Sequence, residues 1–99
     1  MKYRSRDYLI ENYKATFLAK KYATPLYCYS LKKIKKNIEE FKINFKTINP
    51  LICFAVKSNP NTTLLSEIGK LGLGADVVSI GELMKALNSG IKPNKIVFS

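Results

Sequence analysis

From residue 51 onward, short apolar runs alternate with amphipathic stretches, and this alternation limits the possible fold more than any other feature. The mainly apolar runs at 51–56, 75–78 and 95–98 are too short for helices and are bounded by Pro, Gly or polar residues, so they predict strands. The stretches at 61–71 and 79–90 carry apolar residues at helical spacing and predict helices. Right-handed crossovers would make the three strands parallel neighbours. The predicted fold class is α/β, in the order β-α-β-α-β.

Residues typical of helix ends flank both of these predicted helices. Gly72 suits the position just after the first helix, where the backbone often turns left-handed. Ser79 and Glu82 match the capping box, in which both side chains accept hydrogen bonds from backbone N–H groups at the helix start. The second helix is predicted to stop at Gly90.

Two architectures contain this order of elements: a doubly wound open sheet and the opening of a (β/α)8 barrel. A barrel needs about 200 residues or more, whereas this sequence has 99. Three strands cannot close a barrel, and the last strand would leave an unpaired edge. We therefore expect the sequence to be the N-terminal part of a larger protein.

The residues before 51 predict one long helix and two weaker elements. An apolar stripe at intervals of three and four residues predicts a helix over 31–48, with Ser30 as its N-cap and 49–50 as its end. A weaker helical pattern covers 13–22, and 25–29 reads as a short aromatic strand. The stripe consists of Leu31, Ile34, Ile38, Phe41, Phe45 and Ile48.

Basic residues are concentrated in the N-terminal third of the sequence. Seventeen Lys and Arg against seven Asp and Glu give a net charge of +10, of which residues 1–36 hold +8. The lysines of the 31–48 helix lie off its apolar stripe, which is typical of a solvated helix face. A nucleic-acid or acidic-surface binder is the alternative from another class, but no known nucleic-acid motif accompanies the charge.

Several classes of protein are excluded by what the sequence lacks. No apolar run approaches the roughly 20 residues of a membrane span, and the charged start is not followed by the apolar stretch of a secretory signal. Two cysteines, Cys28 and Cys53, cannot form a disulfide framework, so a reduced, cytoplasmic setting is expected. The absence of histidine excludes Cys/His zinc sites and Ser-His-Asp or Cys-His catalysis within the chain.

Lys57 is the strongest candidate for chemistry because it ends an otherwise apolar strand at the carboxyl edge, where βα folds build their sites. Strand alternation would place it on one face with Leu51, Cys53 and Ala55, opposite the bulkier face. That face has room for a ligand, and a lysine beside an apolar wall can attack a carbonyl as a neutral amine. A solvated strand-end lysine is the structural alternative.

Asp76 is the second candidate because it is the only acid inside a predicted strand. Its structural alternative is a strand-end carboxylate that accepts a hydrogen bond from a loop. The segment 72–74 has two glycines but precedes a strand and lacks the third glycine of a dinucleotide fingerprint. We interpret it as a helix stop and turn.

Four segments, in order and covering about residues 20–99, resemble the fold-type III decarboxylases that use pyridoxal phosphate (PLP). This family includes ornithine, diaminopimelate and arginine decarboxylases, and the resemblance is nearest to the branch that acts on diaminopimelate. The family more often has Ala at position 58 and Gly at position 80, where this sequence has Ser and Ile. The similar segments are FAVKSNPN at 54–61, which matches Y-A-x-K-x-N-x-N, GLGADVVSIGEL at 72–83, PNKIVFS at 93–99 and YATPLY at 22–27.

The resemblance implies a fold and a site. Lys57 matches the lysine that binds PLP as a Schiff base, and Asp76 matches an acid close to that lysine. The family fold is a PLP-binding (β/α)8 barrel plus a β domain, so residues 1–30 are expected to contribute to the β domain. Residues 31–99 are expected to form the first strands and helices of the barrel.

The resemblance also implies what this chain does not contain. The phosphate-binding loop, the acid paired with the pyridine nitrogen and the substrate-binding residues are expected after Ser99. The family completes its site with a second subunit, so a homodimer is expected, with a small amino-acid substrate, no metal, no nucleic acid and no membrane. The 99-residue chain alone is expected to be inactive.

Three other interpretations stay open from the sequence. A family member acting on ornithine, arginine or carboxynorspermidine would share the segment around Lys57. A non-catalytic PLP carrier also has a lysine on its first barrel strand, although the region at 20–30 argues against it. A purely structural α/β module is compatible with the periodicity alone.

Overall fold

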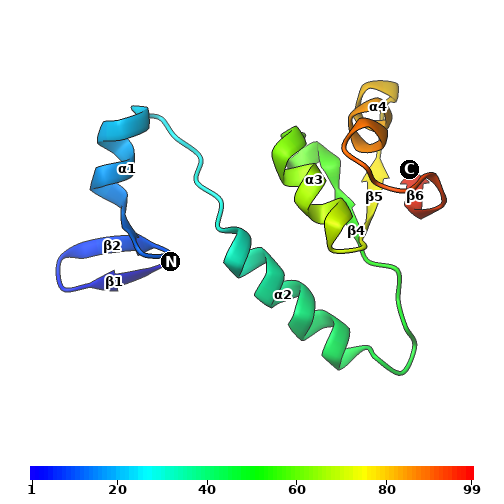
Figure 1. Ribbon diagram of the computed structural model, residues 1–99, viewed down its shortest axis with the longest axis horizontal. Helices are drawn as coiled ribbons and strands as arrows, with labels where there is room; N and C mark the ends of the chain where they lie inside the picture. The colour runs from blue at the N-terminus through cyan, green and yellow to red at the C-terminus, as the bar shows by residue number, and fades with distance from the viewer. The chain divides into compact units, whose positions relative to one another are not determined.

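The computed structural model describes all residues from 1 to 99, which form two compact units, Met1–Glu40 and Phe41–Ser99 (Figure 1). Each unit contains one three-stranded sheet. The sheet of the first unit is antiparallel and that of the second is parallel. No helix in either unit has the length and apolar character that crossing a bilayer requires.

The first unit begins with a small antiparallel sheet that the sequence did not predict. Its order is β1-β2-β3, and tight turns at Ser5 and Glu11, with φ of 58° and 56°, join the strands. A helix follows directly and confirms the helical pattern expected at 13–22, although the helix starts two residues later. The elements are β1 (Lys2–Arg4), β2 (Asp7–Ile10), β3 (Tyr13–Lys14) and α1 (Ala15–Tyr22).

The strand predicted at 25–29 is wrong, because this segment has no regular secondary structure. A strand is stabilised by backbone hydrogen bonds to a neighbouring strand. The sheet of the first unit contains only β1, β2 and β3, so nothing in this unit pairs with residues 25–29. Aromatic composition alone was therefore a misleading signal.

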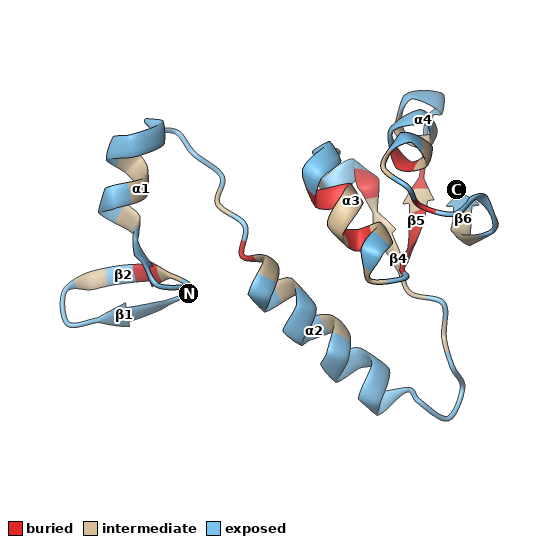
Figure 2. Ribbon diagram, in the orientation of Figure 1, coloured by how far each residue is buried: buried red, intermediate tan, exposed pale blue.

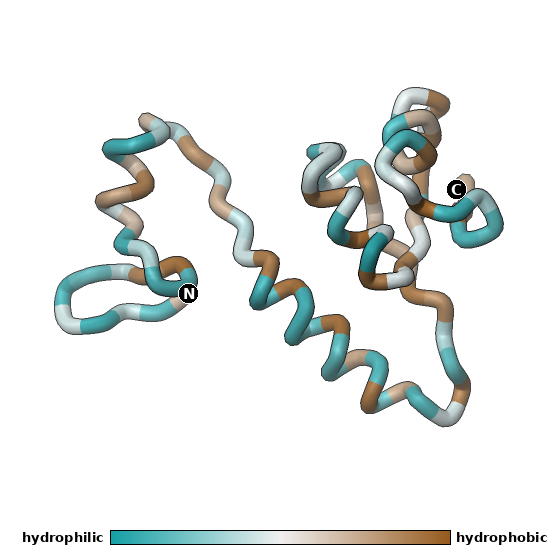
Figure 3. Tube along the Cα trace, in the orientation of Figure 1, coloured by the Kyte–Doolittle hydropathy of each residue, from teal (hydrophilic) through white to brown (hydrophobic).

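Helix α2 (Leu31–Asn44) confirms the long helix, but it ends four residues before the predicted end. Residues 45–48 form a turn, and Asn49 has a φ of 46°. The Ser30 hydroxyl accepts a hydrogen bond from the Lys33 backbone N–H at 3.1 Å, which confirms the predicted N-cap. Figure 3 shows apolar residues recurring along α2 between hydrophilic ones, as the stripe requires.

The second unit confirms the order β-α-β-α-β and its parallel pairing. Strands β4 and β6 flank the central strand β5, and both pair with it in parallel. The elements are β4 (Cys53–Ala55), a 3-10 turn (Val56–Ser58), α3 (Thr62–Lys70), β5 (Gly74–Val77), α4 (Ile80–Asn88), a second 3-10 turn (Pro93–Lys95) and β6 (Ile96–Phe98).

The first strand of this sheet is shorter than predicted at both ends. It starts at Cys53 rather than at 51, and the backbone turns into a 3-10 helix at Val56. The assignment of Lys57 to the strand is therefore wrong, because Lys57 lies inside the turn. Residue 95 likewise belongs to the turn before β6 and not to the strand.

The predicted helix ends agree with the structure. Gly72 has a φ of 80° directly after the C-cap of α3, and Gly90 has a φ of 92° after α4. The Ser79 hydroxyl accepts from the Glu82 backbone N–H at 3.2 Å. The Glu82 carboxylate accepts from the N–H of Val78, one residue before the N-cap, rather than from that of Ser79.

The core of the second unit lies between β5 and its two helices (Figure 2). Ala75 and Val77 lie on the same face of β5 and are fully buried. Val56, in the turn after β4, is fully buried too. Helix α3 contributes Leu64, Leu65 and Ile68 to the core, and α4 contributes Ala86. The opposite face of β5 carries Gly74 and Asp76, so this face is the one free for a site.

Candidate functional site

Lys57 is the middle residue of the 3-10 turn that follows β4, and its side chain is exposed. The turn lies at the carboxyl end of β4, the edge at which the sequence predicted a site. Its neighbour Val56 is completely buried and fixes the turn to the core. The backbone around Lys57 is thus anchored while its side chain reaches solvent.

Polar side chains hold this turn in place. The Ser58 hydroxyl donates to the carbonyl of Ala55, the last residue of β4, at 2.8 Å. The Asn59 backbone N–H donates to the Val56 carbonyl at 3.0 Å, and its side-chain oxygen accepts from the Asn61 N–H at 3.1 Å. Short polar side chains commonly stabilise turns in this way.

Asn61 connects the turn to the next helix. Its side-chain oxygen accepts from the backbone N–H groups of Thr63 and Leu64, at 3.0 and 3.1 Å, and caps α3. Both asparagines of the segment 57–61 therefore stabilise the backbone. Lys57 is the one charged side chain of this segment, and it is exposed.

Asp76 lies on β5, on the face opposite the helices. Its register partners are Ala55 on β4 and Val97 on β6, so these three residues share one face of the sheet. Asp76 is half-buried, and its Oδ1 accepts a hydrogen bond from the Ser99 hydroxyl at 2.8 Å. Lys57 lies in the turn directly after β4 and Asp76 near the end of β5, so both predicted site residues lie toward the carboxyl ends of neighbouring strands.

Small residues line the sheet face that carries Asp76. Cys53 and Ala55 of β4 and Gly74 of β5 share this face through the parallel register. A Cβ at Gly74 would clash with the backbone carbonyl of Lys95 and come within 3.0 Å of the Cys53 sulfur. The strands therefore approach closely here, and no bulky side chain of β4 or β5 covers this face.

The carboxylate of Asp76 acts electrostatically on Cys53. Burial raises the pKa of the Cys53 thiol, and the negative charge of Asp76 raises that pKa further. The thiol also donates weakly to the Lys95 carbonyl, with 3.8 Å between sulfur and oxygen. Cys53 is therefore held as a neutral thiol and is not an activated nucleophile.

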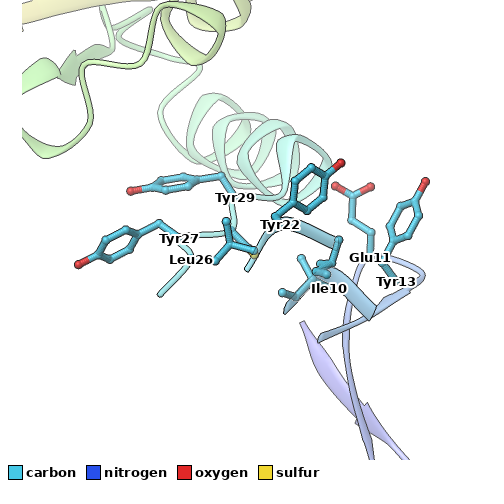
Figure 4. Close-up of a pocket in the computed structure, with 9 residues that line it drawn as sticks. Ile10, Glu11, Tyr13, Tyr22, Leu26, Tyr27 and Tyr29 are labelled. Atoms are coloured by element: carbon cyan, nitrogen blue, oxygen red, sulfur yellow. The ribbon is translucent and has the colours of Figure 1, made fainter. Parts of the chain in front are cut away.

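A separate hollow of about 330 Å³ lies in the first unit (Figure 4). It is formed by β2, α1 and the segment after α1, and Glu11 is its one charged residue. Neither Lys57 nor Asp76 lines it. Cys28 also lines the hollow. The other lining residues are aliphatic or aromatic: Ile10, Tyr13, Leu18, Tyr22, Leu26, Tyr27 and Tyr29.

A comparison with known protein families identifies the larger, C-terminal part of the chain. Residues 31–99 match the family described as pyridoxal-dependent decarboxylase, pyridoxal binding domain. The chain belongs to this family. The family's cofactor is pyridoxal phosphate, which agrees with the resemblance of the segments around Lys57 and Asp76.

Curated relatives of the chain are diaminopimelate decarboxylases. The enzyme of Helicobacter pylori strain J99 is 50% identical over 88 residues, which cover 89% of this chain and 21% of that protein. The enzyme of Aquifex aeolicus is 42% identical over 99 residues, which cover all of this chain and 23% of that protein. The chain thus spans about one fifth of the length of the curated relatives it matches.

Solved structures give the same result. A crystal structure of a protein from Aquifex aeolicus superposes with a TM-score of 0.89 at 43% identity, covering 98% of this chain and 24% of that chain. Diaminopimelate decarboxylase from M. jannaschii, solved in complex with L-lysine, superposes with a TM-score of 0.89 at 38% identity. That match covers 96% of this chain and 23% of the other.

The residues present fit the part of PLP that reacts with an amine. Lys57 offers an exposed primary amine at the carboxyl edge of the sheet, and an aldehyde is the group with which such an amine bonds. Asp76 offers a carboxylate at the neighbouring strand, above a face of small residues. Their roles toward the cofactor stay predictions.

Sequence reasoning missed the residues that hold the site together. It gave no role to Ser58, Asn59 and Asn61, whose bonds shape the turn around Lys57. It also missed Ser99, which bonds to Asp76. Alternation along the last strand was the available signal, because it places residues 97 and 99 on one face.

Proposed function

We propose that this chain is the N-terminal part of a diaminopimelate decarboxylase, which converts meso-2,6-diaminopimelate to L-lysine and carbon dioxide with bound PLP. The observation that carries the proposal is the 50% identity to the Helicobacter pylori enzyme over 89% of this chain. The L-lysine bound in the superposable structure from M. jannaschii is the product expected of this reaction.

The proposal includes the fold of the complete protein. Residues 31–99 would form the opening of a (β/α)8 barrel, which is supported by the parallel order β4-β5-β6 and by the family match that begins at residue 31. Residues 1–30 would contribute to a β domain. The antiparallel sheet of the first unit supports this division, since it is separate from the parallel one.

Lys57 is proposed to hold PLP through its primary amine. The anchored turn supports this role, because Val56 is buried and Ser58 and Asn59 fix the backbone on either side of the lysine's Cα. Asp76 is proposed to lie close to the cofactor with its carboxylate fixed by Ser99. When bound, PLP takes up the electrons left on the substrate carbon as carbon dioxide departs.

The same proposal includes a substrate class, a cellular location and an oligomeric state. The substrate would be a small amino acid, and the enzyme would work in the cytoplasm as a homodimer without nucleic acid or membrane. The +8 charge of residues 1–36 would then belong to solvated surfaces.

The test is a decarboxylase assay on the complete protein that contains this chain. Carbon dioxide release would be measured with meso-diaminopimelate, ornithine, arginine and carboxynorspermidine as substrates. We expect a preference for meso-diaminopimelate. A preference for another amino acid would overturn the substrate assignment, and a source gene that ends at Ser99 would overturn the assignment to a longer enzyme.

The role of Lys57 is tested by Lys57→Ala with Lys92→Ala as the matched control. Both lysines are exposed and belong to the second unit, but Lys92 lies in the loop after α4. Lys57→Ala is expected to lower kcat/KM by about 1,000-fold or more, since it removes the group that bonds to the cofactor. Lys92→Ala should retain wild-type activity, and equal losses in both variants would contradict the proposal.

A further inference from the structure

Ser99 is fixed beside β5 although it lies beyond the last residue of β6. Its backbone N–H donates to the carbonyl of Val77, the last residue of β5, at 3.0 Å. The hydrogen-bond ladder between the two strands therefore continues one residue past Phe98. This backbone hydrogen bond fixes the position of Ser99 independently of its side chain.

Strand alternation brings the Ser99 side chain to the face that carries Asp76. Val97 is the register partner of Asp76, and Ser99 follows Val97 by two residues. The Ser99 hydroxyl donates to Oδ1 of Asp76 at 2.8 Å. A hydrogen bond to an ionised carboxylate is roughly twice as strong as one between neutral groups.

Asp76 has few other means of holding its side chain in one orientation. No salt bridge includes Asp76; the ion pairs of Lys14 with Asp7 and of Lys70 with Glu67 lie elsewhere in the chain. Its pair partners on either side, Ala55 and Val97, have side chains without polar groups. The Ser99 hydroxyl is thus the polar group that orients this carboxylate.

We infer that Ser99 is a positioning residue of the PLP site: its hydroxyl holds the Asp76 carboxylate in the orientation in which Asp76 serves the cofactor. This inference rests on the proposed function. Ser99 acts through Asp76 and needs no contact of its own with cofactor or substrate.

The experiment compares three variants of the complete enzyme: Ser99→Ala, Ser99→Thr and Ser99→Val. Thr and Val have nearly the same shape, but only Thr keeps the hydroxyl. The dissociation constant for PLP would be measured by absorbance titration, and kcat and KM by carbon dioxide release. We expect Ala and Val to weaken PLP binding or lower kcat about 10-fold, and Thr to restore both.

A second comparison separates positioning from a general effect on folding. The Ser99→Ala change would be repeated in an Asp76→Asn background, with thermal unfolding recorded for every variant. If Ser99 acts through the Asp76 carboxylate, Ser99→Ala should change PLP affinity and kcat little in the Asp76→Asn background. An equal loss in both backgrounds, or Thr and Val variants that behave alike, would overturn the inference.

The outcome also separates this inference from the proposed function. A wild-type enzyme that binds PLP, together with a Lys57→Ala variant that does not, would support the proposed function whatever Ser99 does. In that case a Ser99→Ala variant with wild-type PLP affinity and kcat would overturn only the role of Ser99. A wild-type protein that binds no PLP would overturn the proposed function itself.

Discussion

At Gly74, β5 lies very close to the segment that precedes β6. A Cβ at this position would meet the backbone carbonyl of Lys95 and the Cys53 sulfur. A backbone carbonyl cannot swing away as a flexible side chain can, so the strands themselves would have to separate. Gly81, on the first turn of α4, is different, because the nearest atom to its Cβ would be the Ser79 hydroxyl oxygen at 3.9 Å.

We predict opposite effects for alanine at these two glycines. Gly74→Ala should lower the free energy of unfolding by about 2–3 kcal/mol because it overpacks the sheet. Gly81→Ala should raise it by about 0.5 kcal/mol because alanine is the better helix former. Urea denaturation followed by circular dichroism measures both values, and a neutral Gly74→Ala would show that the strands do not approach so closely.

The thiol of Cys53 reports on the charge of Asp76. Both burial and the carboxylate raise its pKa, so the folded chain holds less thiolate at a given pH than the unfolded chain. Thiolate is the form that reacts with iodoacetamide. In a Cys28→Ser background, alkylation of Cys53 should therefore be slower in the folded chain than in urea, and should accelerate as the pH rises toward the raised pKa.

Removing the charge of Asp76 should shift this profile in a defined direction. In an Asp76→Asn variant the carboxylate no longer opposes the thiolate, so the alkylation profile should move to lower pH. The shift should be smaller than the one caused by unfolding, because burial is the larger cause. Mass spectrometry of the alkylated chain over about pH 7–10 measures it, and an unmoved profile would mean that Asp76 exerts no field at Cys53.

At the residue scale the sequence predicted two candidate site residues, Lys57 and Asp76, but not the residues that form hydrogen bonds around them. Lys57 was identifiable because it ends an apolar run at the carboxyl edge where βα folds build their sites, and Asp76 because it is the one acid in a predicted strand. The partners of a site residue are harder to find. Ser99 follows Asp76 by 23 residues, and only the strand register brings the two side chains together.

At the scale of single elements, the two helices of the second unit depend on capping side chains. The Asn61 side-chain oxygen accepts hydrogen bonds from two backbone N–H groups of α3, and the Ser79 hydroxyl accepts one from a backbone N–H of α4. The Asn61 backbone N–H in turn donates a hydrogen bond to the side-chain oxygen of Asn59. The cap of α3 is therefore continuous with the turn that carries Lys57.

We predict that Asn61→Ala lowers the free energy of unfolding by about 1 kcal/mol, because two N–H groups at the start of α3 lose their acceptor. Asn94→Ala is the control, since Asn94 is exposed in the second 3-10 turn and caps no α-helix. Its change should stay within about 0.5 kcal/mol. Equal values for the two variants in urea denaturation would show that the Asn61 cap adds nothing.

Elements with local signals were predicted better than elements that need a distant partner. Helices α2, α3 and α4 have their caps and apolar spacing within one stretch of sequence, and all three were found. The antiparallel sheet of the first unit was missed because its strands are two to four residues long and mostly exposed. Residues 25–29 were assigned to a strand from composition, without any partner to pair with.

At the scale of the whole molecule, the buried apolar residues are unevenly divided between the two units. Leu9 is the buried apolar residue of the first unit, whereas the second unit holds nine others. The parallel sheet of that unit has three strands, and its β4 and β6 edges pair with no other strand of the chain. Parallel sheets are normally covered and extended by further βα units, which agrees with curated relatives about four times as long as this chain.

The last prediction concerns the chain on its own, which spans about one fifth of the length of its curated relatives. The 99-residue chain mixed with PLP and meso-diaminopimelate should release no L-lysine, although it carries Lys57 and Asp76. Rate enhancement by PLP enzymes requires protein groups that bind the cofactor, orient the substrate and exclude water. Here Lys57 is exposed, and the face beside it is supported by only three strands. The complete protein, assayed in parallel by chromatography of L-lysine, is the positive control. Turnover of even a few equivalents by the chain alone would mean that the groups needed for decarboxylation already lie within residues 1–99.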